Sequence, residues 1–397
     1  MRERDIAPHL RGLLTRVDGK PHVLAMTAPD TPRQLPPGTG TPKLRELAHL
    51  ALARLAGAME GWSNPDLLTR TLARREAVQS SQIEGTRTEL DELLTYEATH
   101  SADGLPADVR ITQRYVEALQ RGLAAVREGG RAALDCDLVR QIHAQLMQDH
   151  PALGGVYRDV QAWIGGSSRI DDATFVPTPP SAIAGRMLDL ERSMLRYASA
   201  EDEPFELHVI AQMAIAHAQF ETIHPFHDGN GRTGRILMPL ILAAEGWPPL
   251  YLSGTLMRHR SAYYEALRQV QLQGNWGPWM DMVYRAVTES AQDTLELAHD
   301  LRALAARWSE ATQGFRRHAV AARLPPLLIE HPVVTVSTVA ALLDVSIPAA
   351  TKGINELTKL QILRPDGRKW GQAFHADAVV QRLNRAPLPR SVRNLPR

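Results

Sequence analysis

The segment IHPFHDGNGRTGR, residues 223–235, combines residue types that can bind a phosphate group. Gly229 and Gly231 flank Asn230, and small residues at the start of a helix allow successive backbone N–H groups to point into one concavity. Such a nest binds phosphate through its unpaired donors and the positive end of the helix dipole. The segment therefore predicts an anion-binding loop.

Charged side chains next to this loop favour a polyphosphate ligand. Asp228 provides a hard oxygen ligand suited to Mg²⁺, which takes one or two protein carboxylates and completes its shell with phosphates and water. Arg232 and Arg235 are three residues apart, so both guanidinium groups lie on the first turn of the following helix. Histidine accepts protons near neutral pH, which makes His224 the candidate base for a hydroxyl group that attacks phosphorus.

Two other interpretations of the segment stay open at this point. DGNG alone is a common turn that needs no ligand. A zinc site of His224, His227 and Asp228, together with His217, is conceivable, but its spacing fits no familiar zinc pattern. No GK[ST] closes the loop, so it is not a Walker A motif.

The elements around the segment follow from helical periodicity. From about residue 43 onward, apolar residues recur at intervals of three and four, which is typical of amphipathic helices. The stretch 206–222 has one apolar face and 232–245 is apolar enough to be buried, so the motif is predicted to be a loop between two helices. The predicted helices cover 43–60, 65–84, 88–98, 107–127, 135–148, 181–198, 206–222, 232–245, 259–273 and 278–312.

Two stretches lack this periodicity. Residues 28–42 are rich in Pro, Gly and Thr, which predicts an extended strap. Residues 156–178 contain β-formers on either side of GGSS and are bracketed by prolines, which predicts a β-hairpin or flap. An irregular surface loop is the alternative for this second stretch.

The sequence changes character from about residue 316. A helix, a turn at Asp344–Ser346 and a second helix from about Pro348 precede a segment with Asp366–Gly367 as its hairpin turn. This order predicts a winged helix-turn-helix. Acidic residues and Gly353 weaken the case for a DNA-reading helix, and such modules also bind proteins. The basic residues compatible with DNA are Lys352, Lys359, Arg364, Arg368 and Lys369.

Composition narrows the class of protein. The 397 residues carry a formal net charge of +1, so no global field directs the chain to nucleic acid or an anionic membrane. A single cysteine, Cys136, cannot form an internal disulfide, which favours a reducing compartment. The N-terminus lacks the apolar core of a signal peptide, and no apolar run is long enough to cross a bilayer. We expect a cytoplasmic protein that does not associate with membranes.

The segment HPFHDGNGRTGR at 224–235 resembles the signature of Fic-domain proteins, HPFx(D/E)GNGRxxR, at every defined position. The resemblance extends over roughly residues 35–310 and includes FETIHPF and GNWGPWMDM. Most Fic proteins with this glycine pattern transfer AMP from ATP to a Ser, Thr or Tyr hydroxyl of a target protein. Doc-type relatives that phosphorylate carry Lys in place of Gly231, so this sequence sides with the AMP-transferring majority.

Residue roles carry over from this resemblance position by position. His224 would be the general base, Asp228 the Mg²⁺ ligand and Phe226 the residue that anchors the loop, while His227 falls at a variable position. The expected phosphate-binding residues are Gly229, Asn230, Gly231 and Arg232, with Arg235 at the γ-phosphate.

The predicted flap also resembles its family counterpart, which aligns the target segment by β-strand addition. Gly165, Gly166 and Ser167 would lie near the nucleotide, and Tyr264 near the adenine; simple packing is the alternative for all four. Thr178 departs from the family, which usually has proline there.

A second motif lies at the end of the predicted helix 65–84, which we expect to start with Asn64 as N-cap and to stop at Gly85. Glu84 in the last turn opposes the helix dipole, so a compensating partner is expected. Ser80-x-x-x-Glu84-Gly85 resembles the Fic inhibitory motif, (S/T)xxxE(G/N), in which the glutamate pairs with the arginine equivalent to Arg235 and takes the place of the γ-phosphate. In some relatives this glutamate also assists removal of AMP by water.

The expected protein is thus mainly α, with a Fic-type helical core, a small β-hairpin flap and a C-terminal winged helix-turn-helix. The predicted domains are an N-terminal strap and inhibitory helical region at 1–105, a catalytic core at 106–312 and the C-terminal module at 316–397. The expected cofactors are ATP as substrate and Mg²⁺. Expected partners are a protein with a hydroxyl side chain, the chain itself as a target, and a second copy in a homodimer. The alternative function is a DNA-binding regulator whose Fic part senses nucleotide.

Overall fold

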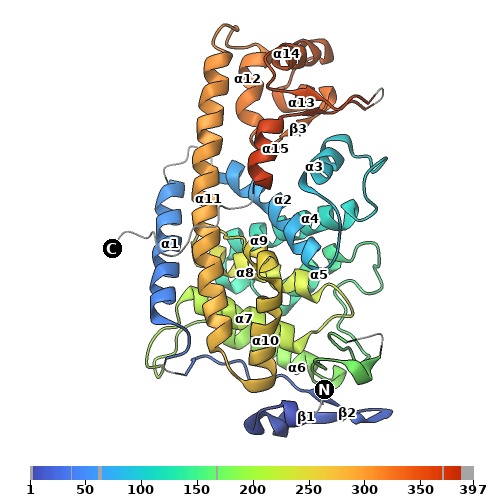
Figure 1. Ribbon diagram of the computed structural model, residues 1–397, viewed down its shortest axis with the longest axis vertical. Coiled ribbons are helices and arrows are strands. Elements are labelled where there is room, and N and C mark those ends of the chain that lie inside the picture. Colours follow the sequence, from blue (N-terminus) through green and yellow to red (C-terminus); the bar gives the residue numbers. More distant parts are fainter. Residues whose placement is uncertain (1–2, 37, 61–64, 167–168, 369–370, 386–397) are drawn as a thin grey trace. The chain divides into compact units, whose positions relative to one another are not determined.

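The computed structural model describes residues 3–36, 38–60, 65–166, 169–368 and 371–385. Over these ranges the chain is mainly helical, with small antiparallel sheets (Figure 1). Its residues cluster into two compact units. The first unit comprises Met1–Gly61, Gln79–Thr86 and Ile111–Ala291, and the second comprises Trp62–Val78, Arg87–Arg110 and Gln292–Arg397.

Most helices lie wholly within one unit. The first unit contains β1 (Leu14–Val17), β2 (Lys20–Met26), α1 (Pro42–Glu60), α5 (Cys136–Leu146), α6 (Pro180–Leu190), α7 (Val209–Ile223), α8 (Asn230–Ala244), α9 (Ser253–Arg258) and α10 (Arg260–Gln273). The second contains α3 (Leu90–Thr99), α12 (Val320–Leu327), β3 (Val333–Val334), α13 (Val336–Leu343), α14 (Ile347–Lys359), β4 (Arg364–Pro365), β5 (Phe374–His375) and α15 (Asp377–Asn384). Three helices contribute residues to both units: α2 (Pro65–Ile83), α4 (Val109–Gly129) and α11 (Gly277–Ala311).

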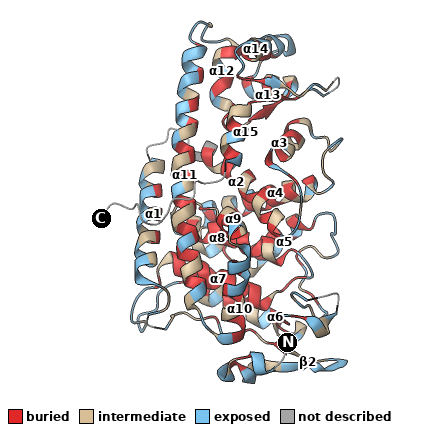
Figure 2. Ribbon diagram, in the orientation of Figure 1, coloured by how far each residue is buried: buried red, intermediate tan, exposed pale blue. Residues whose placement is uncertain are grey.

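The core of the first unit is built around α7 and α8. Every residue of α7 from Ile210 to Ile223 is buried, and so is most of α8 (Figure 2). Because such helices have no polar face, their polar side chains must find partners inside the protein. Gln212 and Gln219 do so by donating to the carbonyl oxygens of Leu207 and Pro29, each at 2.5 Å. The second of these bonds fixes the strap to α7.

The helices predicted from periodicity are confirmed, with ends that differ by a few residues. Two differences stand out. The predicted helix 181–198 is regular only to Leu190 and continues as a π-helical turn, Glu191–Leu195. The short helix α9 was not predicted, because six residues carry too little of a 3.6-residue period to be recognised.

An N-terminal hairpin was also missed. Strands β1 and β2 pair in antiparallel fashion across Asp18–Gly19, a dipeptide typical of two-residue hairpin turns. The hairpin shares an apolar cluster with the predicted flap. This cluster contains Ile6, Leu10, Val23, Ala25, Met26, Ala173, Phe175, Val176 and Leu272.

The predicted flap at 156–178 forms less β-structure than expected. Ile164 and Phe175 make an isolated antiparallel bridge, and a 3₁₀ turn, Ile170–Asp172, lies between them. The prediction of a hairpin with its turn at GGSS was therefore too regular for the described residues. The hydroxyl of Thr178 accepts a hydrogen bond from the backbone N–H of Ala28 at 3.0 Å. Proline could not make this bond, which gives the departure from the family a physical reason at the point where strap and flap meet.

The helices and strands predicted after residue 316 form within the second unit. Helix α13 ends at Asp344, which has φ of +51°, and α14 follows after two further residues. Strand β5 lies between β3 and β4. Pro365 pairs with Phe374, and the N–H of Asp366 donates to the carbonyl oxygen of Ala373 at 2.9 Å, so Asp366 still belongs to the paired part of the hairpin. The prediction of Asp366–Gly367 as the hairpin turn was therefore wrong.

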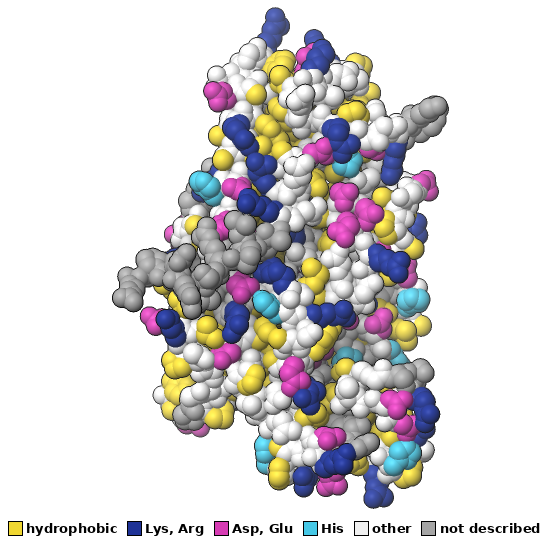
Figure 3. Space-filling model, in the orientation of Figure 1, with side chains coloured by type: hydrophobic (Ala, Val, Ile, Leu, Met, Phe, Trp, Pro, Cys, Tyr) yellow, Lys and Arg dark blue, Asp and Glu magenta, His cyan; other side chains and the backbone are white. Residues whose placement is uncertain are grey.

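Over the part of the chain that the structure describes, none of the helices is long and apolar enough to span a membrane. The face in view in Figure 3 carries basic and acidic side chains interspersed, as expected for a net charge near zero.

Candidate active site

The loop between α7 and α8 is held from inside the protein. His224 ends α7 with φ of +51°, a left-handed conformation that is uncommon for residues other than glycine. The ring of Phe226 is fully buried and stacks on His143, with 3.7 Å between the ring centroids. Asn230 accepts from the N–H of Phe226 at 2.9 Å and donates to its carbonyl at 2.8 Å. The loop backbone is thereby fixed at both ends.

Helix α8 begins without a side-chain cap. Its N-cap residue is Gly229, with φ of +75°, which has no side chain that could accept from the first N–H groups of α8. The carboxylate of Asp228 accepts from the N–H of Gly229 at 2.6 Å. A helix N-terminus with free donors is an anion-binding site, and the residues present fit the predicted phosphate cradle.

The charges around this N-terminus differ in exposure. The side chain of Asp228 is 72 % exposed, whereas that of Arg232 is 9 % exposed and its Nε has no hydrogen-bond partner among the described residues. The two side chains lie 3.5 Å apart. The described residues contain no cluster of three or more His, Cys, Asp or Glu side chains that could hold a metal ion alone. Asp228 therefore fits Mg²⁺ only as one ligand of an ion that also binds phosphates and water.

His143 is a part of this site that sequence reasoning missed. Its Nε2 lies 2.9 Å from the carbonyl oxygen of Asp228, and its Nδ1 accepts from the N–H of Gly155 at 2.9 Å. Burial lowers the pKa of His143 to about 4, so the ring is neutral and can play both roles. The sequence feature that could have identified His143 is its position on the apolar face of the predicted helix 135–148.

Arg158 was missed as well. It is buried, and its guanidinium donates to the carbonyl oxygens of His224 at 2.8 Å, Val160 at 3.0 Å and Thr178. Its own N–H donates to Pro225 at 2.9 Å. Burial lowers the pKa of Arg158 to about 10, and the cation is held by carbonyl dipoles. Arg158 thus joins the flap to the loop that carries His224.

The structure brings the two predicted motifs together. Arg235, whose side chain is 1 % exposed, donates through Nη2 to Glu84 Oε1 at 2.7 Å and through Nε to Ser80 Oγ at 2.8 Å. Burial alone would lower the pKa of Arg235, but the charge of Glu84 raises it above its ordinary range. Gly85, with φ of +101°, follows the end of α2 as predicted.

Glu84 also lies against the start of α8. A Cβ added to Gly231 would collide with Glu84 Oε1 and would lie 3.0 Å from Arg235 Nη1. The carboxylate therefore occupies space directly beside the glycine of the predicted cradle. Tyr264 lies in the same electrostatic neighbourhood, since burial and the charge of Glu84 raise its pKa.

The remaining predicted contacts have local packing explanations. Gly165 and Gly166 have φ of +69° and +78°, and a Cβ on either would collide with Thr174 or with the backbone of Asp172. Ser167 lies outside the described residues. Tyr264 is 41 % exposed, with its ring 5.0 Å from that of Tyr263. The structure brings Ser80 of α2 and Glu84, which directly follows α2, together with residues of the 224–235 motif at α8.

Comparison with known proteins decides the family. The description "Fic/DOC family N-terminal" matches residues 43–124, and "Fic/DOC family" matches residues 133–242. The chain therefore contains an N-terminal domain and a catalytic-type domain of the Fic/DOC family over these two ranges. The first match contains Ser80 and Glu84, and the second contains the whole 224–235 motif, so both motifs belong to family domains.

Proteins similar to this chain include curated proteins named "Protein adenylyltransferase Fic". The one from Culex quinquefasciatus is 31 % identical over 183 residues, which are 45 % of this chain and 33 % of the relative. The one from Aedes aegypti is 33 % identical over 160 residues, or 40 % and 28 % of the two chains. The chain thus spans about a third of the length of these relatives.

Solved structures show the same fold. A Fic family protein from Desulfovibrio desulfuricans G20 matches with a TM-score of 0.52 and 20 % identity, over 86 % of this chain and 98 % of that one. A Fic domain containing signaling protein from Bacteroides thetaiotaomicron matches with a TM-score of 0.51 and 16 % identity, over 63 % and 97 %. At these identities the likeness establishes the fold alone.

Proposed function

We propose that the protein is an adenylyltransferase that transfers AMP from ATP to a Ser, Thr or Tyr hydroxyl of a target protein. The observation that carries the proposal is the uncapped start of α8 at Gly229, with the unpartnered Nε of the buried Arg232 beside it. Backbone donors at a helix N-terminus, together with a buried guanidinium whose Nε lacks a partner among the described residues, favour the binding of an anion. The names of the curated relatives support AMP as the transferred group.

In this reaction the target hydroxyl oxygen forms a bond to the α-phosphorus of ATP, and the bond to the bridging oxygen of the β-phosphate breaks. Pyrophosphate leaves with that bonding pair, and His224 takes the hydroxyl proton. Gly229, Asn230, Gly231 and Arg232 hold the phosphates. Mg²⁺ on Asp228 would supply charge neutralisation for the leaving group. The protein acts mostly by positioning and electrostatics.

The resting protein is inhibited by its own helix in this proposal. Arg235 is needed at the γ-phosphate but is held by Glu84 and Ser80, and Glu84 also fills space beside Gly231. ATP and Glu84 therefore compete for one guanidinium.

Incorporation of labelled AMP tests both claims. We expect wild type to label a target, or itself, weakly. Glu84→Gly should label at least tenfold more, and the double variant Glu84→Gly/His224→Ala should not label at all. Glu201→Gly, an exposed acid in a loop, is the matched control and should behave like wild type. Equal labelling by wild type and Glu84→Gly would refute the inhibition, and a transferred mass other than AMP would refute the reaction.

The reverse reaction needs a separate assay. A target that already carries AMP, incubated with wild type and with Glu84→Gly, reveals whether Glu84 assists hydrolysis. Loss of AMP only with wild type would assign that role to Glu84. The same samples, run through a sizing column with light scattering, test the expected homodimer.

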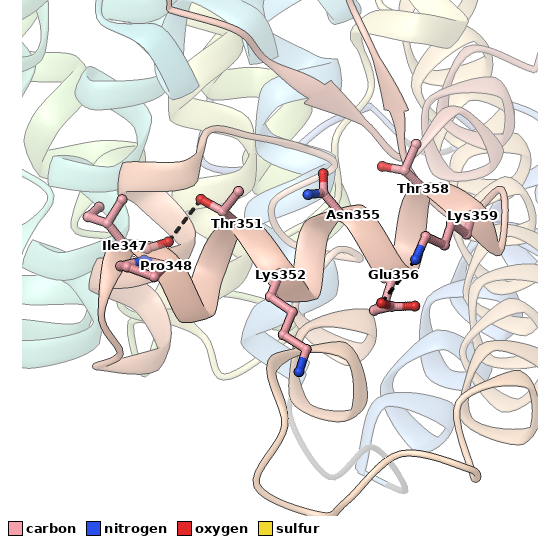
Figure 4. Close-up of a pocket in the computed structure, with 8 residues that line it drawn as sticks. All are labelled: Ile347, Pro348, Thr351, Lys352, Asn355, Glu356, Thr358 and Lys359. Atoms are coloured by element: carbon pink, nitrogen blue, oxygen red, sulfur yellow. Dashed lines mark hydrogen bonds and ion pairs between the residues drawn. The ribbon is translucent and has the colours of Figure 1, made fainter.

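We further propose that the region 316–397 is a winged helix-turn-helix module, with domains 1–105 and 106–312 before it. Support comes from the order α13, turn, α14, β4 and β5 in the described part of the second unit. DNA binding is the second candidate function. It is favoured by the solvent-facing side of α14, where Thr351, Lys352 and Asn355 line a surface depression (Figure 4).

Ion pairing reduces the charge available for DNA. Lys359 pairs with Glu356 at 3.2 Å, Arg364 with Asp377 at 2.5 Å and Arg368 with Asp366 at 3.4 Å. Lys369 lies outside the described residues. A mobility-shift assay with the full chain decides the matter: salt-dependent binding lost in Lys352→Ala would support DNA recognition, and its absence at low salt would exclude it.

A further inference from the structure

A buried acid lies beneath the loop that carries His224. Glu221 is on the last turn of α7, and its side chain is 10 % exposed. Its Oε2 is 3.7 Å from Nδ1 of His224, three residues later. Neither Glu221 Oε1 nor His224 Nδ1 has a hydrogen-bond partner among the described residues. Oε2 of a buried carboxylate thus faces a ring nitrogen that lacks a hydrogen-bond partner, at a distance just beyond hydrogen bonding.

The helices around Glu221 leave room for a carboxylate and hold it ionised. Burial would raise the pKa of Glu221, but His224, His217 and Arg235 together lower it below its ordinary value. His217 belongs to α7 and is bound through Nε2 to the hydroxyl of Tyr263 on α10, at 2.9 Å.

Helix α8 approaches Glu221 without a side chain at the point of contact. A Cβ on Gly234 would lie 2.9 Å from Glu221 Oε1 and 3.2 Å from Nδ1 of His217. Glycine at this position therefore preserves the pocket for the carboxylate. Neither the motif HPFx(D/E)GNGRxxR nor the inhibitory motif gives Glu221 or Gly234 a role.

An imidazole can act as a base through only one nitrogen at a time. A carboxylate that accepts from Nδ1–H fixes the tautomer whose lone pair is on Nε2, and it stabilises the imidazolium formed when Nε2 takes a proton. We propose that Glu221 is the positioning residue that orients His224 through Nδ1 and leaves Nε2 as the base. This inference rests on the proposed transfer reaction.

The proton balance follows directly. When the target hydroxyl attacks, its proton moves to Nε2 of His224, the new oxygen–phosphorus bond forms and pyrophosphate departs. Glu221 remains ionised throughout and pairs with the imidazolium. The proton then passes from Nε2 to solvent, which restores the neutral ring. The distance of 3.7 Å closes to a hydrogen bond in the reacting complex, as catalytic hydrogen bonds often tighten on substrate binding.

The variant Glu221→Gln, made in the Glu84→Gly background, tests the proposal. The amide keeps the shape and can still accept from Nδ1–H, but it carries no charge. We expect kcat to fall roughly 10- to 100-fold with little change in the KM for ATP. The acid limb of the pH profile of kcat should move to lower pH, because the imidazolium loses its counter-charge. The groups that also face this pair are His217, Arg235 and Tyr263, and they are unchanged.

A conservative variant and a control complete the assay. Glu221→Asp keeps the charge, so it should keep the acid limb of the native profile even where the rate is reduced. Glu191→Gln removes a mostly buried acid that binds the N–H of Cys136 elsewhere in the first unit, and it should leave the pH profile unchanged. A purely structural role for Glu221 would lower the rate of Glu221→Gln without moving the limb, and that result would overturn the proposal.

A measurement without activity separates this inference from the proposed function. Nitrogen-15 NMR of labelled histidines, with His224 assigned by its loss in His224→Ala, reports the tautomer and the titration midpoint directly. We expect Nδ1–H in the Glu84→Gly protein and a lower midpoint after Glu221→Gln. The opposite tautomer, or an unchanged midpoint, would refute the role of Glu221 even if AMP transfer were established. The predicted NMR result without any AMP transfer would keep the pairing and refute the reaction.

Discussion

Two helix–loop–helix segments of this chain, α7–α8 and α13–α14, have the same backbone conformation at the end of their first helix but differ at the start of their second helix. Helix α7 ends at His224 and α13 ends at Asp344, and both residues adopt left-handed conformations with φ of +51°. In the first segment the following helix starts at Gly229 with no cap, whereas in the second Ser346 caps α14 by accepting from the N–H of Ala349. An uncapped N-terminus keeps its donors for a ligand, and a capped one uses a donor for stability.

Burial separates the two segments as well. Nearly all of α7 and most of α8 are buried, while α14 buries one side and leaves a polar side to solvent. Chemistry needs oriented groups away from water, and surface recognition needs accessible ones. The difference suits the first segment to catalysis and the second to binding.

The largest expected effect is the loss of the cation Arg232 on α8, compared with the loss of the cation Lys352 on α14. In the Glu84→Gly background, Arg232→Ala should lower the rate of AMP transfer by roughly 100-fold or more, because it removes a buried donor to the phosphates. Lys352→Ala on α14 should leave the rate unchanged. Initial rates of labelled AMP incorporation measure both. If Arg232→Ala and Lys352→Ala lowered the rate of AMP transfer equally, catalysis would not be confined to the α7–α8 segment.

Replacing a glycine by alanine should have a similar effect on stability in α8 and in α14. A Cβ on Gly234 would crowd Glu221 and Phe220, and one on Gly353 would collide with the Val320 side chain. We expect Gly234→Ala and Gly353→Ala to destabilise the protein by about 1–3 kcal/mol through overpacking. Urea unfolding followed by circular dichroism measures the loss.

Gly185 on α6 is the matched control for these glycines, because no atom lies within 4 Å of an added Cβ. Gly185→Ala should stabilise the protein by up to about 1 kcal/mol, since alanine favours helix. If Gly185→Ala destabilised the protein as much as Gly234→Ala and Gly353→Ala, overpacking would not explain the losses at Gly234 and Gly353. Gly353, which we expected to weaken α14, is instead the residue that permits close contact with α12.

Lowering the pH should destabilise the α7–α8 segment at a higher pH than the α13–α14 segment. The N-cap of α7 is His208, whose Nδ1 accepts from the N–H of Ala211 at 3.1 Å, whereas the N-cap of α13 is Thr335, which does not titrate. Burial lowers the pKa of His208 to about 4, below its ordinary value near 6.5. The unfolded chain therefore binds more protons between these values, and the stability is full above pH 6.5 and falls as pH drops toward 4.

The expected slope is about 1.4 kcal/mol per pH unit for this histidine. His208→Asn keeps a good N-cap without a titrating group, so it should remove that share of the slope. Free energies of unfolding at several pH values between 4 and 7 provide the measurement. An identical slope in wild type and His208→Asn would contradict the assignment.

The smallest expected effect is at the cap of α14. Ser346 Oγ lies 3.4 Å from the N–H of Ala349, a long and exposed contact. Ser346→Ala should cost about 0.5–1 kcal/mol and leave AMP transfer unchanged. Asp135→Ala, which removes the 2.8 Å bond to Leu138 at the start of α5, serves as the comparison and should cost more. Thermal unfolding of the two variants ranks them.

Much of the first segment could be predicted from the sequence because its chemistry is local. One short stretch of sequence contains His224, Asp228, Gly229 and Arg232. The apolar periodicity on both sides of this stretch predicts that it is a loop between two helices. The pairing of Glu84 with Arg235 came from a resemblance, since 151 residues separate them and no local pattern links them.

The residues that support the loop could not be predicted in this way. His143 and Arg158 reach it from α5 and from the flap. Their partners are backbone carbonyl and N–H groups, which every residue type provides, so the sequence gives no sign of them. The flap appeared more regular in sequence than it is, because the N-terminal hairpin at 14–26 supplies part of its packing. The contacts of His143 and Arg158 and the irregular form of the flap depend on packing between segments that are distant in sequence.

In the proposed function, competition between ATP and Glu84 for Arg235 would make the protein a sensor of nucleotide concentration. A ligand that needs Arg235 binds only the fraction of molecules in which the ion pair is open, so its apparent dissociation constant is the intrinsic value divided by that fraction. Each 1.4 kcal/mol contributed by the pair raises the half-saturating ATP concentration about tenfold. A partner that draws Glu84 away by binding therefore shifts the whole response along the ATP axis without touching the residues that perform the reaction.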